Sequence, residues 1–262
     1  MKGSPVGIFD SGVGGTSIWK EIYQLMPNEN TIYLADSKNA PYGEKSEKEI
    51  LQLSIKNTEV LLEKGCKIIV VACNTATTNA IDFLRANFKV PFIGIEPAIK
   101  PAALQSRSKT VGVLATKGTL TSKLFHSTSE NHARGITIIE REGTGLVPLI
   151  EQGKTSSEEV EVLLRQYLSP MLDQGIDYLV LGCTHYPYLI PVLKKFLPDT
   201  VQIIDSGEAV ARQTKAILQK SDMLNTSYFS GKHQFYTNGD MKIMKSFLKD
   251  VGVDFSVEKR SF

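Results

Sequence analysis

Two copies of one strand pattern occur in this chain, and each copy ends at a cysteine. Residues 65–73 (GCKIIVVAC) align without a gap on residues 175–183 (GIDYLVLGC), at a constant offset of 110 positions (175 − 65 = 183 − 73 = 110). Residues 6–11 (VGIFDS) match residues 111–116 (VGVLAT), and residues 91–96 answer residues 201–205 at nearly the same distance past each cysteine. A repeat of this kind predicts two structurally related halves.

Short β-branched runs alternate with longer amphipathic segments along most of the chain. This alternation is typical of parallel sheets covered by helices, so we predict an α/β fold. The expected strands cover residues 6–10, 31–34, 67–72, 91–95, 110–115, 136–139, 177–182, 201–205 and 234–236. Capping-box pairs, Ser46 with Glu49 and Ser156 with Glu159, predict two helix starts, and Gly65 and Gly175 stand where those helices should end.

The repeat also predicts the domain organisation. We expect one half to cover residues 1–96 and the other to cover residues 97–205. The remaining segment, 206–262, is expected to return and pack on the first half.

Composition excludes several classes of protein. Hydrophobic residues make up 42% of the 262 residues and the formal net charge is only +2, with no run of basic and aromatic residues that would follow a nucleic acid. No apolar stretch reaches the roughly 18 residues that span a bilayer, and the first residues do not resemble a signal peptide. We therefore expect a cytoplasmic protein without nucleic-acid or membrane partners.

The cysteines that end the repeated strands are the strongest candidates for chemistry. Cys73 and Cys183 stand at strand ends, where open α/β sheets bind ligands. A single cysteine in such a place is more often a core residue, but two at equivalent positions beside polar side chains favour catalysis. Cys66 aligns with Ile176 and is expected to be a core residue. Three widely spaced cysteines do not suggest a disulfide framework.

A glycine-rich turn follows the first strand, in residues 10–15 (DSGVGG). It has neither the lysine of a P-loop nor the spacing of a dinucleotide-binding loop, and Asp10 would repel a phosphate. An aspartate and a serine on such a turn suit an α-ammonium group or a proton relay. Without any other cofactor fingerprint, we expect no cofactor and no bound metal.

Several short motifs together resemble those of the glutamate racemases, in the aspartate/glutamate racemase superfamily. They are Asp10-Ser11 before the glycines, Pro41-Tyr42-Gly43, Cys73-Asn74-Thr75, Glu96-Pro97, Glu151 and Cys183-Thr184-His185. The resemblance runs from about Val6 past Ser206, and the order and spacing make it specific. One departure is Thr16, where the family often has an aliphatic residue.

This resemblance implies two pseudo-symmetric α/β domains with the active site between them. It implies a cofactor-independent racemase that interconverts L- and D-glutamate and supplies D-glutamate for peptidoglycan. Cys73 and Cys183 match the catalytic acid/base pair, and Asp10, Glu151 and His185 match residues that assist them. The matching substrate-binding set is Asp10, Ser11, Tyr42, Gly43, Asn74, Thr75, Thr184 and His185.

Other readings remain open at this stage. An aspartate or hydantoin racemase of the same superfamily is the nearest, and a non-catalytic two-lobed amino-acid-binding protein would also have paired α/β halves. A zinc site at Cys73, Cys183 and His185 lacks the local spacing of zinc ligands. A homodimer is compatible with the sequence, which does not fix the oligomeric state.

Overall fold

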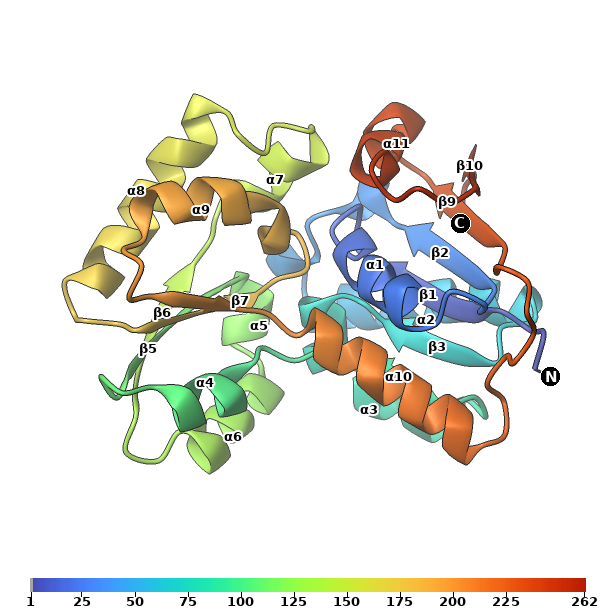
Figure 1. Ribbon diagram of the computed structural model, residues 1–262, viewed down its shortest axis with the longest axis horizontal. Helices are drawn as coiled ribbons and strands as arrows, with labels where there is room; N and C mark the ends of the chain where they lie inside the picture. Colours follow the sequence, from blue (N-terminus) through green and yellow to red (C-terminus); the bar gives the residue numbers. More distant parts are fainter. Residues whose placement is uncertain (1) are drawn as a thin grey trace.

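The computed structural model describes residues 2–262, apart from the side chain of His132. It contains two parallel β-sheets, each covered by helices (Figure 1). The first has the order β10-β9-β2-β1-β3-β4 and the second the order β6-β5-β7-β8. The strands of the first sheet are β1 (Val6–Asp10), β2 (Thr31–Ala35), β3 (Ile68–Val71), β4 (Phe92–Gly94), β9 (His233–Thr237) and β10 (Phe255–Lys259); those of the second are β5 (Thr110–Ala115), β6 (Thr137–Glu142), β7 (Tyr178–Gly182) and β8 (Gln202–Ile204).

The repeat seen in the sequence is also visible in the order of the strands. The order β2-β1-β3-β4 of the first sheet corresponds to β6-β5-β7-β8 of the second. In the first sheet β1 lies between β2 and β3, and in the second sheet β5 lies between β6 and β7. Strands β3 and β7 are the ones that precede the two cysteines. The predicted α/β fold with two pseudo-symmetric parallel sheets is therefore confirmed.

Helices surround each sheet, and the segment after β8 crosses back to the first sheet as α10 (Figure 1). In chain order the α-helices are α1 (Thr16–Leu25), α2 (Glu47–Glu63), α3 (Asn74–Asn87), α4 (Ile99–Gln105), α5 (Lys117–Leu120), α6 (Lys123–His132), α7 (Leu146–Glu151), α8 (Glu158–Leu172), α9 (Ile190–Phe196), α10 (Gly207–Lys220) and α11 (Met241–Leu248). Three 3₁₀ helices, η1 (Ser37–Asn39), η2 (Tyr42–Glu44) and η3 (Tyr186–Leu189), lie in loops at the carboxyl ends of strands. No helix within residues 2–262 has the length and hydrophobicity needed to cross a membrane.

Helix boundaries follow the capping signals with one shift. Ser46 and Glu49 form the predicted capping box at the start of α2. Gly65 and Gly175, with φ of +76° and +74°, follow the ends of α2 and α8 in the left-handed conformation that glycine adopts without strain. The prediction of Ser156 as a cap was wrong by one residue, because the Ser157 side chain accepts the hydrogen bond from the Val160 N–H.

Two strands differ from the prediction at the edges of the sheets. Strand β6 runs on to Glu142, three residues beyond the predicted end, and all its residues except Ile139 are exposed or half-buried, as is common in an edge strand. Strand β10 (Phe255–Lys259) was not predicted, since most of its residues are exposed or half-buried and charged residues interrupt the apolar pattern. Strands β9 and β10 belong to the carboxyl-terminal tail, residues 206–262, and extend the first sheet beyond β2.

A buried ion pair fastens the tail to the amino-terminal ends of these strands. The ammonium of Lys67, just before β3, lies 2.7 Å from the carboxylate of Glu29, and each side chain is only 1% exposed. Lys67 Nζ also donates to the carbonyls of Lys2 and Met223, and Glu29 Oε1 accepts from the N–H of Asn225. The pair and its hydrogen-bond partners thus join four separate segments of the chain at the end of the strands opposite the cysteines.

Candidate active site

Cys73 stands at the junction between β3 and α3. Its residue is the N-cap of α3, and its Sγ accepts a hydrogen bond from the Ala76 N–H at 3.4 Å. Burial raises the pKa of this thiol well above its usual value, and the negative charge of Asp10 raises it further. The Ala76 N–H and the Ser11 side chain act in the opposite direction. At neutral pH Cys73 is therefore a thiol.

The second cysteine is followed by a different local structure. Helix α3 begins directly after Cys73, but after Cys183 the chain forms the 3₁₀ helix η3 and enters α9 only at Ile190. The reason is Pro187, which has no N–H to donate to the Cys183 carbonyl in an α-helix. That carbonyl accepts instead from the Tyr186 N–H at 3.1 Å. A helix N-terminus does not assist Cys183.

His185 takes that place beside Cys183. Its Nδ1 lies 3.8 Å from Cys183 Sγ, and its Nε2 lies 2.6 Å from Glu151 Oε1. Burial acts to lower the pKa of His185, but the hydrogen bonds to Cys183 and Glu151 outweigh burial and raise it well above the usual value. The raised pKa favours the protonated imidazole, which lies between Cys183 Sγ and Glu151 Oε1; the Gly14 N–H also approaches its Nε2, at 3.3 Å.

Glu151 has a larger role in the geometry than its position on a helix suggested. It is the last residue of α7, and its Oε1 also accepts from the Val13 N–H at 2.6 Å. The side chain is only 12% exposed. In the sequence, only the family resemblance singled out Glu151.

Asp10 lies at the end of β1 and is fully buried. Its Oδ2 accepts from the N–H groups of Gly12 and Gly15 at 3.3 and 2.8 Å, and its Oδ1 accepts from the Thr184 hydroxyl at 3.2 Å. Burial raises the pKa of Asp10 to about 6, against the opposing effect of the positive charge of His185. Asp10 can therefore accept a proton near neutral pH.

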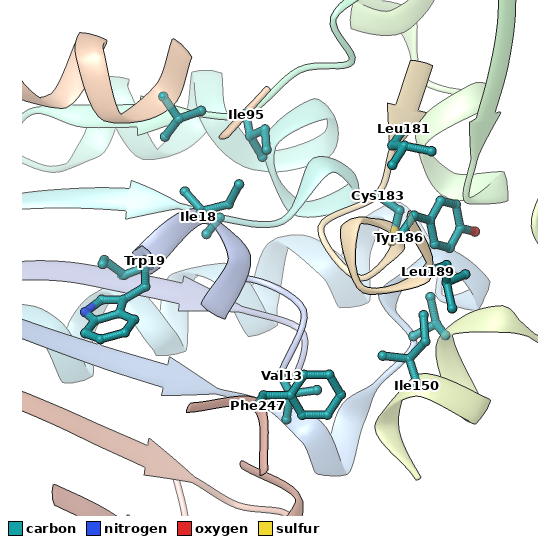
Figure 2. Packing of buried hydrophobic residues seen from close by; sticks show 14 of the residues in the cluster. Val13, Ile18, Trp19, Ile95, Ile150, Leu181, Cys183, Tyr186, Leu189 and Phe247 are labelled. Atoms are coloured by element: carbon teal, nitrogen blue, oxygen red, sulfur yellow. The ribbon is translucent and has the colours of Figure 1, made fainter. Parts of the chain in front are cut away.

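The glycines of the turn after β1 are required by close contacts between the halves. A Cβ added to Gly12 would lie 1.9 Å from Glu151 Oε1, and one added to Gly14 would lie 2.2 Å from His185 Nδ1. The turn therefore packs directly against the side chains of the second half and leaves no room for a phosphate there. Figure 2 shows Val13 of this turn beside Phe247, with Ile150 of α7 near Leu189, within one continuous apolar cluster.

The two cysteines have unlike neighbours despite the repeat. The position equivalent to Asp10 in the second half is Ala115, by the alignment of residues 6–11 with 111–116. The position equivalent to His185, two residues after Cys183, is Thr75 in the first half. A carboxylate thus accompanies the first cysteine and an imidazole the second.

Asn74, next to Cys73 in the chain, has polar groups without partners. Both Nδ2 and Oδ1 of Asn74 are buried without a hydrogen-bond partner. Buried amides in native proteins are nearly always paired, so this side chain is arranged for a ligand. Thr184, which follows Cys183 in the chain, and Ser11, which lies close to Cys73, are also buried.

A hydroxyl cluster joins the halves on one side of the site. Thr75 Oγ1 lies 2.8 Å from Thr116 Oγ1 and 3.3 Å from Thr119 Oγ1, and the latter two are 3.0 Å apart. Thr116 and Thr119 were not singled out from the sequence. The repeat carried a signal for Thr116, since it aligns with Ser11.

Tyr42 and Gly43 lie in the loop between β2 and α2. The Tyr42 hydroxyl donates to Asp36 Oδ2 at 2.6 Å and accepts from Asn57 Nδ2 at 3.0 Å. Burial and the negative charge of Asp36 raise the pKa of Tyr42 well above its usual value, so it remains a donor. A Cβ on Gly43 would lie 2.7 Å from Thr116 Cβ in the second half. Asp36 is a further residue that the sequence did not indicate.

The cleft between the halves is closed in this structure. A cavity of about 20 Å³, room for one water, separates the loop at Pro41, Gly43 and Glu44 from Thr116, Lys117 and the segment 142–145. Within residues 2–262 no group of three or more His, Cys, Asp or Glu side chains is arranged to hold a metal ion. This geometry does not support the zinc reading.

Comparisons with known proteins identify the family of the chain. The profile of the family described as Asp/Glu/Hydantoin racemase matches residues 16–214. The glutamate racemase of Herpetosiphon aurantiacus is 44% identical over 240 residues, which are 92% of this chain and 94% of the relative.

Two solved structures extend the comparison over nearly the whole chain. The Escherichia coli glutamate racemase in complex with L-glutamate and the activator UDP-MurNAc-ala has a TM-score of 0.85 and 33% identity, covering 98% of each chain. The Francisella tularensis glutamate racemase in complex with D-glutamate has a TM-score of 0.83 and 29% identity, also covering 98% of each chain. The chain therefore belongs to the glutamate racemases, isomerases of the Asp/Glu/Hydantoin racemase family.

Proposed function

We propose that this protein interconverts L- and D-glutamate by moving the α-proton between the substrate and two cysteines. The observation that carries the proposal is the placement of Cys73 and Cys183 at equivalent strand ends on the two sides of one buried polar site. Racemisation needs a base on one face of the α-carbon and an acid on the other, and a duplicated fold supplies one thiol for each face. Relatives crystallised with L-glutamate and with D-glutamate support the choice of substrate.

Each cysteine would take a different protonation state before the reaction. His185 Nδ1 lies 3.8 Å from Cys183 Sγ, close enough to exchange a proton with this sulfur. Cys73, next to the carboxylate of Asp10, stays a thiol. Conversion of L- to D-glutamate needs a thiolate at Cys183 as the base and a thiol at Cys73 as the acid. In that direction, Cys183 removes the α-proton of L-glutamate and Cys73 delivers a proton to the opposite face.

The reverse direction starts from the opposite proton arrangement. Cys73 must then be the thiolate that removes the proton of D-glutamate. Its ionisation is assisted when Asp10 takes up the thiol proton and when the substrate α-ammonium group brings a positive charge into the site. A carboxyl with a pKa near 6 suits this exchange at neutral pH.

The remaining residues of the proposed site would hold the substrate. Asn74 offers an unpartnered buried amide, and Ser11, Thr75 and Thr184 offer hydroxyls. Donors aimed at the substrate α-carboxylate would stabilise the carbanion-like transition state. The backbone of Tyr42 and Gly43 closes the site toward the second half. Because the cleft is closed, binding requires the halves to separate along the segments that line the small cavity.

We also propose the biological setting that the family resemblance implies. The enzyme would act in the cytoplasm without a cofactor and supply D-glutamate for peptidoglycan, either as a monomer or as a homodimer. The domain division would be residues 1–96 with 206–262 for the half that carries Cys73, and residues 97–205 for the half that carries Cys183.

Deuterium exchange tests this function directly. When the metal-stripped protein is incubated with L-glutamate in heavy water, we expect optical rotation to fall to zero while deuterium enters the α-position of the D-product. Aspartate should react far more slowly, because polar groups placed for a carboxylate one methylene further out would be left unpaired. NMR and polarimetry follow both quantities. Racemisation without deuterium in the product would exclude the proposed proton exchange. Equal kcat/KM values for aspartate and glutamate would exclude glutamate as the specific substrate.

Isotope effects separate the roles of the two helper residues. Since L- and D-glutamate have equal free energy in water, no variant can change kcat/KM in one direction alone, so isotope effects must report the direction. We expect Asp10→Asn to raise the α-deuterium isotope effect mainly with D-glutamate, by making the Cys73 step more rate-limiting. His185→Asn should raise it mainly with L-glutamate. The assignment is wrong if the effects rise together or are exchanged between the variants.

A further inference from the structure

We infer that Asn238, in the tail of the chain, is a positioning residue for the loop that carries Tyr42 and Gly43. The inference rests on the proposed function for its kinetic part. Asn238 follows strand β9, which lies beside β2 with Thr237 paired to Ala35. The tail turn and the loop after β2 therefore leave the sheet side by side.

The Asn238 side chain holds that loop with both ends of its amide. Its Oδ1 accepts from the Lys38 N–H at 2.8 Å, and its Nδ2 donates to Asp36 Oδ1. The Asn238 N–H also donates to the Ala35 carbonyl at 3.3 Å. One half-buried side chain thus fixes both the backbone and the central carboxylate of the loop.

Asp36 connects Asn238 to Tyr42 through hydrogen bonds. Its Oδ1 also accepts from Asn39 Nδ2 at 2.8 Å, and its Oδ2 accepts from the Tyr42 hydroxyl at 2.6 Å. The carboxylate is 2% exposed, so its orientation depends on these protein donors rather than on water. Losing the Asn238 donor leaves Asn39 alone to hold Oδ1, so the orientation of Asp36 and the position of Tyr42 become less fixed.

A glycine next to Asn238 provides an independent sign of the same contact. A Cβ added to Gly239 would lie 2.6 Å from Ser37 Cβ, although the φ of Gly239 is not positive. Glycine is therefore required here by the close approach of the tail turn to η1. Asn238 and Gly239, two successive residues of the tail, therefore both pack closely against the loop.

The position of this loop matters because it forms one side of the closed cleft. Pro41, Gly43 and Glu44 line the small cavity, and Gly43 packs on Thr116 of the second half. A loop that moves by a fraction of an ångström loses this contact. We therefore expect the tail to influence substrate binding although it contributes no residue to the site itself.

A matched pair of asparagine variants tests the inference. Asn225 is also half-buried in the tail, and its Nδ2 donates to the Asn28 carbonyl at 2.6 Å while its Oδ1 accepts from the Ser227 N–H. It ties the same tail to the same half at the opposite end of the strands. Asn238→Ala and Asn225→Ala should therefore cost similar stability.

Only Asn238→Ala should change binding. Losing a hydrogen bond to a buried carboxylate is expected to raise KM for both enantiomers about tenfold, with kcat changed less than about twofold. Amide hydrogen exchange of residues 36–45, measured without substrate, should accelerate in Asn238→Ala and stay at the wild-type rate in Asn225→Ala. Unchanged KM and unchanged loop exchange in Asn238→Ala would overturn the inference. An inactive wild-type protein would instead overturn the proposed function, and the exchange data would still decide whether Asn238 positions the loop.

Discussion

Replacing either Cys73 or Cys183 with alanine is expected to reduce racemisation by at least about 1,000-fold, in the range that a general acid or base supplies. Each variant removes the proposed proton carrier on one face of the substrate. The helper residues cannot replace it, because Asp10 and His185 hold their own partners around the site. Circular dichroism of the glutamate solution measures the rate from either enantiomer.

Cys66 provides the control of the same residue type. It is also buried and free, but it packs against Gly7 and Leu61 on the covered face of the first sheet. Burial raises the pKa of its thiol to about 12, so it carries no thiolate at neutral pH. Cys66→Ala should keep most of the activity and lose about 1 kcal/mol of stability. Equal losses of activity in all three variants would point to folding rather than catalysis.

The largest effect on stability is expected for Lys67→Met. This variant leaves the Glu29 carboxylate buried without its counter-charge and removes two further hydrogen bonds to carbonyls. Breaking a buried pair in this way costs about 3–5 kcal/mol. At about 2–4 °C per kcal/mol for a chain of this size, Tm should fall by roughly 10 °C. Differential scanning calorimetry gives the value.

Two further variants show whether the uncompensated charge is the cause. Adding Glu29→Gln to Lys67→Met removes the stranded charge and should restore part of the lost Tm. Arg212→Met breaks an exposed pair with Glu208, in which both side chains are more than half exposed, and should cost less than about 0.5 kcal/mol. A double variant as unstable as the single one would show that packing, rather than charge, carries the loss. The kcat/KM of Lys67→Met is expected to stay close to wild type, since Lys67 and Cys73 lie at opposite ends of β3.

Much of the fold could be predicted because the signals are local. The buried central strands β1 and β5 were placed at their observed ends, since each is a short apolar run with no competing helical pattern. The edge strands β6 and β10 were misjudged because one face of an edge strand is wet and its pattern is diluted by charged residues. The late start of α9 also has a local cause, Pro187, which the sequence contained.

The candidate site was only partly predictable because its bonds join distant segments. The repeat identified both cysteines, and the family resemblance identified Glu151. Its contacts with His185 and Val13 span 34 and 138 residues, and no sequence pattern records such a distance. The same holds for Asp36 and Asn238, which are 202 residues apart and meet only because β9 pairs with β2.

The unlike neighbours of the two cysteines have a consequence for mirror-image inhibitors. The two proposed substrates are enantiomers of equal energy in water, yet the groups that receive them are not mirror images. Asp10 has no counterpart at Ala115, and His185 has none at Thr75. An inhibitor that places an anionic group beside Cys183 meets a protonated imidazole, whereas its enantiomer places the same group beside a buried carboxylate. Electrostatics alone would therefore give the two forms different affinities, even if both fitted the closed cleft equally well.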